Sequence, residues 1–347
     1  MNFCERYYNI HDIVKFKIVS KAGPFAWQFN NIYDNYKGFE SGGIDTPNFT
    51  VYLGKFTPSN QDCYIADSKY YIKEDYFYCK HDSYKFANWE FEMSGFDSGH
   101  TEVRISSNIP GYISVSGFII DFLIHYKMND RGYPLVHAAG ISRNNRGFLF
   151  AGGSKAGKTT IALHFLEKGF GLLGDDFVII SNGGMQSFIR PSSMFTYNLP
   201  TAVKKSFGKR DRISLGSRYL LSKITAGYIT MFMRLNAEDM FPNSLVDKSE
   251  LGAVFLLMPQ QEFHLEKIGK DELITHLVTN QKLQLLFFDK YILEYSYFFP
   301  DSKLSAYWDK YEENLARNLG GNIPYYKIGV PLEYSEGLFE EISGLMG

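Results

Sequence analysis

The chain of 347 residues is 45% apolar and 21% charged, a balance typical of globular proteins rather than disordered ones. Its formal net charge of −2 argues against a general binder of nucleic acid or of anionic membranes, which would carry a basic excess. Cys4, Cys63 and Cys79 form neither a CxxC pair nor a metal-ligand cluster, which fits a reducing compartment. The start of the chain has no signal-peptide pattern, and the apolar run at residues 117–126 is too short for a membrane span, so we expect a cytoplasmic protein.

Residues 1–110 are expected to form a β-rich accessory domain that contributes to substrate recognition. Short aromatic and β-branched runs alternate there with clusters of Gly, Asn, Asp and Pro, which is the pattern of strands joined by turns. No chemical motif appears in this part of the sequence. The clearest predicted strands are at residues 49–53, 70–72, 76–79 and 89–93.

Residues 111–347 are expected to form a second domain of the α/β (α+β) class with a mixed sheet. An apolar stretch predicts a helix over residues 117–127, and two strands are predicted over residues 135–141 and 147–151. Asn144 and Asn145 separate these strands, and asparagine tolerates the left-handed backbone that a tight hairpin turn requires. A two-residue turn there would pair residues whose numbers sum to 289.

A helix is predicted over residues 159–168, because its apolar side chains fall on one side and Gly169 stands where a C-terminal glycine belongs. Strand-like runs follow at residues 171–173 and 177–180. The later sequence predicts a buried strand, a helix and a final strand, at residues 252–258, 271–288 and 324–330.

The segment between the strand and the helix has the spacing G-x-x-x-x-G-K-[ST]. Glycines let the backbone curl so that successive N–H groups point into one concavity, where phosphate oxygens accept their hydrogen bonds. The following helix adds the positive end of its dipole. Lys158 would reach the β- and γ-phosphates, and Thr159 would offer its hydroxyl to Mg²⁺. The predicted nucleotide-binding residues are Gly152, Gly153, Ser154, Lys155, Ala156, Gly157, Lys158, Thr159 and Thr160.

One predicted helix and one short predicted strand separate Lys158 from Asp175 and Asp176. The chain is therefore expected to return beside the phosphate loop where this Asp pair lies. Two adjacent carboxylates can divide labour: one can ligate Mg²⁺ while the other accepts the proton of an attacking hydroxyl. His137 would lie opposite Gly152 in the expected hairpin. A histidine there could donate to a phosphate oxygen or orient the acceptor hydroxyl.

Residues 134–181 resemble the catalytic domain of HPr kinase/phosphorylase and related proteins, a domain that also resembles phosphoenolpyruvate carboxykinase. The shared pattern runs from a histidine through a hairpin, the phosphate loop and a short helix ending in glycine to an Asp-Asp pair. The resemblance implies an ATP- and Mg²⁺-dependent serine kinase. It implies that His137 lies near the transferred phosphate and that Asp175 and Asp176 serve as base and metal partner. Members of the family often form homo-oligomers, although no residue of this sequence demands one.

Two departures mark this chain as a divergent member. Thr160 stands where HPr kinases usually have Glu, and the segment after the Asp pair lacks their glycine-rich signature. The chain looks more like divergent relatives, some of which phosphorylate ribosomal peptide precursors, than like enzymes acting on HPr. The acceptor is therefore expected to be a protein or peptide, with no nucleic-acid or membrane partner.

The predicted reaction is in-line phosphoryl transfer, with Mg²⁺ near Thr159 and Asp176 and with Asp175, or its neighbour, as the base. A non-catalytic nucleotide-binding regulator or scaffold, a nucleotide hydrolase and a small-molecule kinase remain alternatives. The basic segment at residues 204–212 could close over ATP, and Arg190 could stabilise charge on the transferred group.

Overall fold

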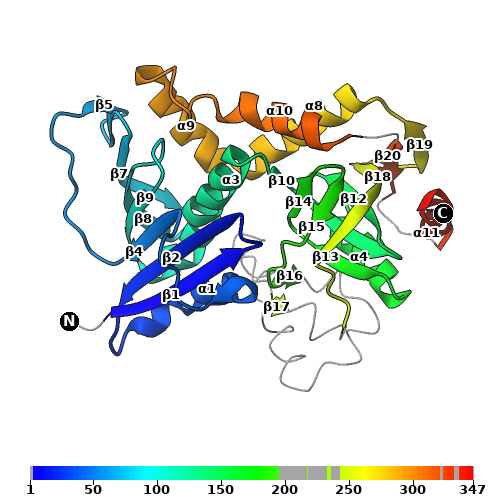
Figure 1. Cartoon of the computed structure of the whole chain (residues 1–347), viewed down its shortest axis with the longest axis horizontal. Helices are drawn as coiled ribbons and strands as arrows, with labels where there is room; N and C mark the ends of the chain where they lie inside the picture. The colour runs from blue at the N-terminus through cyan, green and yellow to red at the C-terminus, as the bar shows by residue number, and fades with distance from the viewer. Residues whose placement is uncertain are drawn as a thin grey trace. The chain divides into compact units, whose positions relative to one another are not determined.

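The computed structural model describes residues 3–194, 217, 233–235, 243–320, 323–331 and 336–346. The chain forms two compact units, each with a mixed β-sheet and helices (Figure 1). The first unit combines Met1–Leu135 with Gln281–Leu315, and the second combines Val136–Asn280 with Ala316–Gly347. The predicted α/β class is therefore confirmed at the level of two large mixed sheets with helices.

The first unit contains a nine-stranded sheet in the order β3-β1-β2-β4-β9-β8-β7-β6-β5. The β2–β4 and β4–β9 pairs are parallel, and the other pairs are antiparallel. The predicted strands in this region are all present. The bounds are β1 (Phe3–Ile10), β2 (Val14–Lys21), β3 (Glu40–Ser41), β4 (Phe49–Leu53), β5 (Tyr64–Ala66), β6 (Tyr70–Lys73), β7 (Tyr76–Tyr84), β8 (Ala87–Ser94) and β9 (Thr101–Ser107).

Apolar and polar side chains alternate along the strands of this sheet, and the apolar ones mark the face that is covered. In β2, Phe16 and Ile18 are fully buried, whereas Lys15 and Lys17, which precede them in turn, are partly exposed. Successive side chains point to opposite faces, so the apolar residues collect on one face. The helices of this unit are η1 (Ala26–Phe29), α1 (Asn30–Asn35), η2 (Lys37–Phe39), α2 (Ile109–Val115), the π-helical η3 (Ser116–Ile120), α3 (Asp121–Asp130), α9 (Leu286–Phe298) and most of α10 (Tyr307–Asn318).

Residues 109–130 form a continuous helical stretch of 22 residues with a hydropathy of 1.3, which is long and apolar enough to cross a membrane by length and composition alone. However, 67% of that apolar window is buried inside the protein. Phe122 stacks on Phe288 of α9 with ring centroids 3.5 Å apart, and Ile124 is fully buried. The stretch is longer than the helix expected at residues 117–127, and its burial gives it the character of a core helix.

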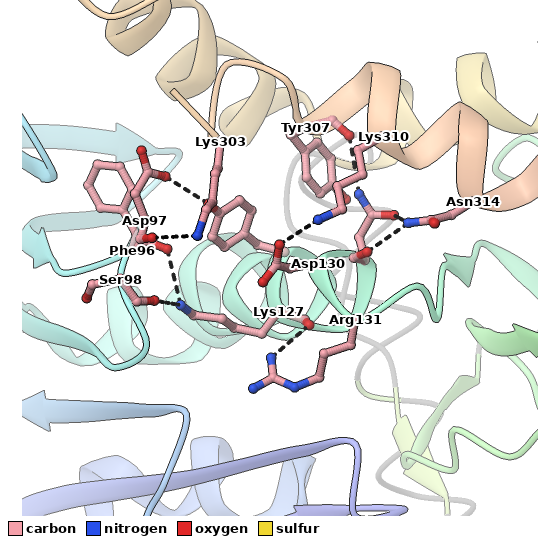
Figure 2. Close-up of polar contacts among 12 residues, drawn as sticks. Phe96, Asp97, Ser98, Lys127, Asp130, Arg131, Lys303, Tyr307, Lys310 and Asn314 are labelled. Carbon is pink, nitrogen blue, oxygen red and sulfur yellow. Dashed lines mark hydrogen bonds and ion pairs between the residues drawn. The ribbon is translucent and has the colours of Figure 1, made fainter. Parts of the chain in front are cut away.

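Polar contacts hold residues 281–315 against the rest of the first unit, from which they are distant in sequence (Figure 2). They run from α10 and the preceding loop to α3 and to the loop after β8. The contacts join Lys303 Nζ to Asp97 O at 2.8 Å, Lys310 Nζ to the Asp130 carboxylate at 2.6 Å, and Asn314 Nδ2 to Asn129 O at 2.7 Å. This unit therefore extends past the boundary expected at residue 110, because its covering helices come from two separate parts of the sequence.

The second unit is built on a sheet in the order β10-β14-β15-β18-β12-β11-β13, with β20 beside β18 and β19 beside β20. The β12–β18 and β18–β20 pairs are parallel. Its helices are α4 (Lys158–Glu167), most of α8 (Lys270–Gln284) and α11 (Glu336–Met346). The strands are β10 (Leu135–Val136), β11 (Ala138–Arg143), β12 (Arg146–Gly152), β13 (Gly171–Gly174), β14 (Val178–Ser181), β15 (Gly184–Gln186), β18 (Lys248–Pro259), β19 (His264–Lys267) and β20 (Tyr325–Val330), with β16 (Ser192–Met194) and β17 (Met233–Leu235) as a separate pair.

A hydrophobic core joins α4 and α11 to the central strands of this sheet. Phe150 of β12 stacks on Phe255 of β18 with centroids 4.9 Å apart. Phe165 of α4 and Phe339 of α11 complete the same cluster. Burying several aromatic side chains of this size, at roughly 25 cal/mol per Å² of apolar surface, fixes α4 against β12. The loop that joins β12 to α4 is thereby held at both ends.

Two further predicted elements differ from the structure. The strand expected at residues 135–141 is interrupted at His137, which lies between β10 and β11. The helix expected at residues 271–288 is divided at Leu285, whose φ of −104° and ψ of 30° leave the helical region. Neither break falls at a glycine or proline, the residues that usually mark the end of a helix or strand, so the sequence does not reveal them.

Candidate functional site

The β11–β12 hairpin brings His137 and the start of the phosphate loop to the same edge of the sheet. Asn144 and Asn145 both have positive φ, at 53° and 61°, as a tight two-residue hairpin turn requires. The pairing runs from Arg143 with Arg146 to Ala138 with Ala151, which confirms the predicted register. His137 directly precedes Ala138 and Gly152 directly follows Ala151, so both lie next to that last pair.

The phosphate loop joins the end of β12 at Gly152 to the start of α4 at Lys158. The expected context of strand, glycine-rich turn and helix is therefore present. Gly157 caps the helix with a φ of 95°, a left-handed conformation that glycine adopts without strain. A Cβ on Gly152 would lie 2.8 Å from the Leu257 carbonyl oxygen, so only glycine fits against β18 there. Gly153, Ser154 and Lys155 form the exposed rim of the loop.

Lys158 is the buried cation of this site, with 7% of its surface exposed. Its ammonium donates to the carbonyl oxygens of Gly152 and Gly153, at 2.8 and 2.9 Å. Burial lowers its pKa to about 8, and the Asp176 and Asp175 carboxylates offset part of that shift. An ammonium held among carbonyl oxygens at the start of a helix is well placed for exchange onto phosphate oxygens.

The Asp pair directly follows β13 in the chain, and β13 pairs with β11 in the sheet. The Asp176 carbonyl oxygen accepts a hydrogen bond of 3.2 Å from Ala138 N, so the backbone of the pair lies beside the start of β11. Both carboxylates are half-buried, and both act electrostatically on Lys158. The structure therefore brings Asp175, Asp176 and Lys158 together, as the spacing predicted.

His137 lies in the gap between β10 and β11, with 6% of its surface exposed. The buried Asn280 of α8 donates to the His137 carbonyl oxygen at 3.1 Å. The His137 ring lies 5.5 Å from the ring of Phe177, the residue that follows the Asp pair. The backbone of His137 is thus held by α8, and its ring lies beside the residue that follows the Asp pair.

Thr159 and Thr160 lie in the first turn of α4 and are partly exposed. Among the residues that the structure describes, no group of three or more His, Cys, Asp or Glu side chains could hold a metal ion. Magnesium commonly binds through one or two carboxylates together with substrate phosphates, so the predicted pairing of Thr159 with Asp176 suits a metal that arrives with the nucleotide. The basic segment at residues 204–212 lies outside the described residues.

Three residues near this site were missed or left open by sequence reasoning. Asn280 and Phe177 carry no motif, because an amide on a helix and an apolar side chain after two aspartates are common features. Arg190 was only a candidate. Its guanidinium lies over the Phe177 ring, 5.3 Å from the centroid, and over the Phe188 ring at 5.4 Å. Only the folded backbone brings these groups together.

Comparisons with known proteins give little further support. No protein-family model matches the chain, and no curated protein matches it by sequence. Among solved structures, the chain is similar to the HPr(Ser) kinase/phosphatase from Coxiella burnetii, with 14% identity and a TM-score of 0.26 over 61% of this chain and 87% of that one. A TM-score this low carries no argument for fold or activity, so function must be inferred from the site.

Proposed function

We propose that the second unit binds ATP with Mg²⁺ at residues 152–160 and transfers the γ-phosphoryl group to the hydroxyl of a serine or threonine in a protein or peptide. One observation carries the proposal: the buried Lys158 ammonium lies at the start of α4 between loop carbonyl oxygens and within the electrostatic reach of Asp175 and Asp176. Phosphate-binding and proton-accepting groups thus meet at one place.

Binding would rest on the loop and on the end of the helix. The N–H groups of a curled glycine-rich loop donate hydrogen bonds to phosphate oxygens, and the α4 dipole favours an anion at its N-terminus. Lys158 would leave the Gly152 and Gly153 carbonyl oxygens and donate to the β- and γ-phosphates. This exchange costs little, since one set of charge-assisted hydrogen bonds replaces another.

The residues present fit a magnesium ion. The Thr159 hydroxyl and the Asp176 carboxylate are hard oxygen donors, which this metal prefers over nitrogen or sulfur. When bound, the metal would neutralise charge on the phosphate oxygens. The protein's own contribution is to present these two oxygens beside the loop.

In the transfer itself, the acceptor oxygen forms a bond to the γ-phosphorus while the bond from that phosphorus to the β–γ bridging oxygen breaks. The electron pair of the broken bond stays on ADP. The hydroxyl proton goes to Asp175, or to Asp176 if the adjacent carboxylates exchange roles. His137 would orient the acceptor hydroxyl. Catalysis rests on positioning and charge neutralisation rather than on a covalent intermediate.

The test is incubation of the full chain with γ-labelled ATP, Mg²⁺ and candidate peptide acceptors, including the products of neighbouring genes. We expect label on the acceptor. Lys158→Met should abolish nucleotide binding, whereas Asp175→Asn should keep nucleotide binding and lose transfer. If Asp175→Asn transferred label at the wild-type rate, the base assignment would be wrong.

The same experiment separates the alternative functions. Nucleotide binding with no labelled product would indicate a regulator or scaffold. Release of labelled phosphate without a labelled acceptor would indicate a hydrolase, and label on a small molecule would indicate a small-molecule kinase. Absence of MgATP binding by calorimetry would remove the basis of the proposal.

A further inference from the structure

Phe177 is the point at which three functional groups of the second unit meet. It directly follows Asp176 in the chain, and 3% of its surface is exposed. Its ring lies 5.5 Å from the His137 ring and 5.3 Å from the Arg190 guanidinium carbon. One buried aromatic ring therefore contacts the proposed orienting histidine and an arginine, at a position fixed next to the Asp pair.

Arg190 is held against two rings rather than one. Its guanidinium lies 5.4 Å from the centroid of Phe188, whose own ring meets the Phe177 ring edge-on at 6.2 Å. Phe188 is also buried, and its backbone N–H donates to Leu173 O, next to the end of β13. These contacts tie the start of the 188–190 segment to the strand that leads into Asp175 and Asp176.

The Phe177 and Phe188 rings stand nearly perpendicular to each other, at 87°, and the Arg190 guanidinium lies over both of them. The five N–H donors of arginine lie in the plane of the group and point outward from its edge, in a fork that matches the oxygens of a phosphoryl group. An aromatic ring attracts a cation through the face of the ring. The Phe177–Phe188 pair therefore limits the rotation of the Arg190 guanidinium.

We propose that Arg190 binds the oxygens of the phosphoryl group during transfer, and that Phe177 positions both Arg190 and His137 around the Asp pair. This inference rests on the proposed phosphotransferase function. Three oxygens of the transferred group carry charge that spreads as the bond to ADP breaks, and a fixed cation there stabilises that state more than the ground state. The positive Arg190 guanidinium stabilises this negative charge, while Asp175 or Asp176 takes the proton.

The test compares binding of MgADP alone with binding of MgADP plus aluminium fluoride, which mimics a phosphoryl group in transfer and needs no acceptor. The wild-type chain should bind the fluoride complex more tightly than MgADP. Arg190→Gln should lose roughly a hundredfold of that gain, while its affinity for MgADP alone stays within about twofold of wild type. Arg190→Lys should lose most of the gain too, since an ammonium lacks the planar fork.

Variants of Phe177 separate positioning from mere packing. Phe177→Leu keeps an apolar side chain but removes the ring, so it should lose part of the gain. Phe177→Tyr should retain it. The matched control is Arg143→Gln, because the exposed Arg143 lies over the Phe170 ring at the same 5.3 Å but at the turn of the hairpin. It should bind both complexes as the wild type does.

The outcomes are distinguishable. A full fluoride gain in Arg190→Gln or Arg190→Lys would overturn the inference. So would a wild-type chain that binds MgADP without any gain from fluoride. Failure of the wild type to bind MgADP at all would instead reject the proposed function. If Arg190→Gln failed to fold, as judged by circular dichroism, Arg190→Lys, which keeps the stem and the charge, would decide the question.

Discussion

At the residue scale, the state of Lys158 sets the pH dependence of nucleotide binding. Its pKa of about 8 reflects burial, and phosphate oxygens favour its charged form. Binding must therefore take up a proton when the ammonium is already deprotonated. Above pH 8 we expect the dissociation constant for MgATP to rise about tenfold per pH unit, as titration calorimetry between pH 7 and 10 would measure.

Lys158→Arg is the control for this effect, because a guanidinium stays charged throughout that range. Whatever its absolute affinity, its dissociation constant should change little between pH 7 and 10. Equal slopes in the wild type and the arginine variant would show that Lys158 does not titrate on binding.

Replacing glycine by alanine should affect stability and MgATP affinity differently at two positions of the loop. Gly157→Ala places a side chain at a φ of 95°, which costs roughly 1–2 kcal/mol of stability and distorts the cap of α4. Gly153→Ala is the matched control, since a Cβ there meets nothing within 4 Å. We expect Gly157→Ala to lower both the unfolding midpoint in urea and the MgATP affinity, and Gly153→Ala to leave stability nearly unchanged. The reverse order would mean that the loop adopts another backbone conformation.

At the scale of elements, the packing of α10 against α3 should be stabilised more by buried amides than by exposed charges. Asn314 is 1% exposed, and its amide donates to both the backbone and the side chain of Asn129 (Figure 2). Lys310, on the same helix, forms its ion pair with Asp130 while 42% of its side chain is exposed. Asn314→Ala should therefore lower the free energy of unfolding by about 1–3 kcal/mol. Lys310→Ala should lower it by less than about 1 kcal/mol.

Chemical denaturation of both variants would check this ranking. A larger loss for Lys310→Ala than for Asn314→Ala would show that the exposed ion pair, rather than the buried amide, fastens α10 to α3.

Elements whose causes are local could be predicted from the sequence. The Asn144–Asn145 turn fixes the register of β11 with β12, and the apolar side of residues 159–168 with Gly169 fixes α4 to within one residue at either end. From these two elements, the proximity of the Asp pair to Lys158 follows. Contacts between distant residues could not be predicted: the return of residues 281–315 to the first unit and the position of Arg190 over Phe177 depend on the packed fold.

At the scale of the whole molecule, buried tyrosines are distributed unevenly between the two units. In the first unit, burial raises the pKa of many phenols, to about 12 for Tyr78 and Tyr295 and higher for others. Among the described residues of the second unit, only Tyr325 shows such a rise. The buried set in the first unit includes Tyr8, Tyr70, Tyr76, Tyr126, Tyr291, Tyr307 and Tyr311.

This asymmetry predicts that the first unit unfolds first in alkali. A phenol whose folded pKa exceeds its unfolded value of about 10 contributes stability that is complete below pH 10 and is lost as the pH rises toward the folded pKa. Each such group removes about 1.4 kcal/mol per pH unit. Lys127 of the first unit and Lys158 of the second change stability in the opposite direction. Because their pKa values are lowered to about 8, both lysines add stability as the pH rises from 8 to about 10.5. One lysine in each unit cannot offset the difference in tyrosines.

Hydrogen exchange followed by mass spectrometry between pH 9 and 11.5, corrected for the intrinsic pH dependence of exchange, should therefore show peptides from residues 3–135 and 281–315 losing protection before those from β11, β12 and β18. Tyr307→Phe provides the internal check, because the buried Tyr307 hydroxyl has no hydrogen-bond partner among the described residues. Removing it leaves no polar group unsatisfied and deletes one ionisable phenol, so the variant should be at least as stable as the wild type near pH 7 and should unfold at a higher pH. Loss of protection at one pH in both units would mean that they unfold as a single cooperative body, with tyrosine burial in the first deciding the stability of the second.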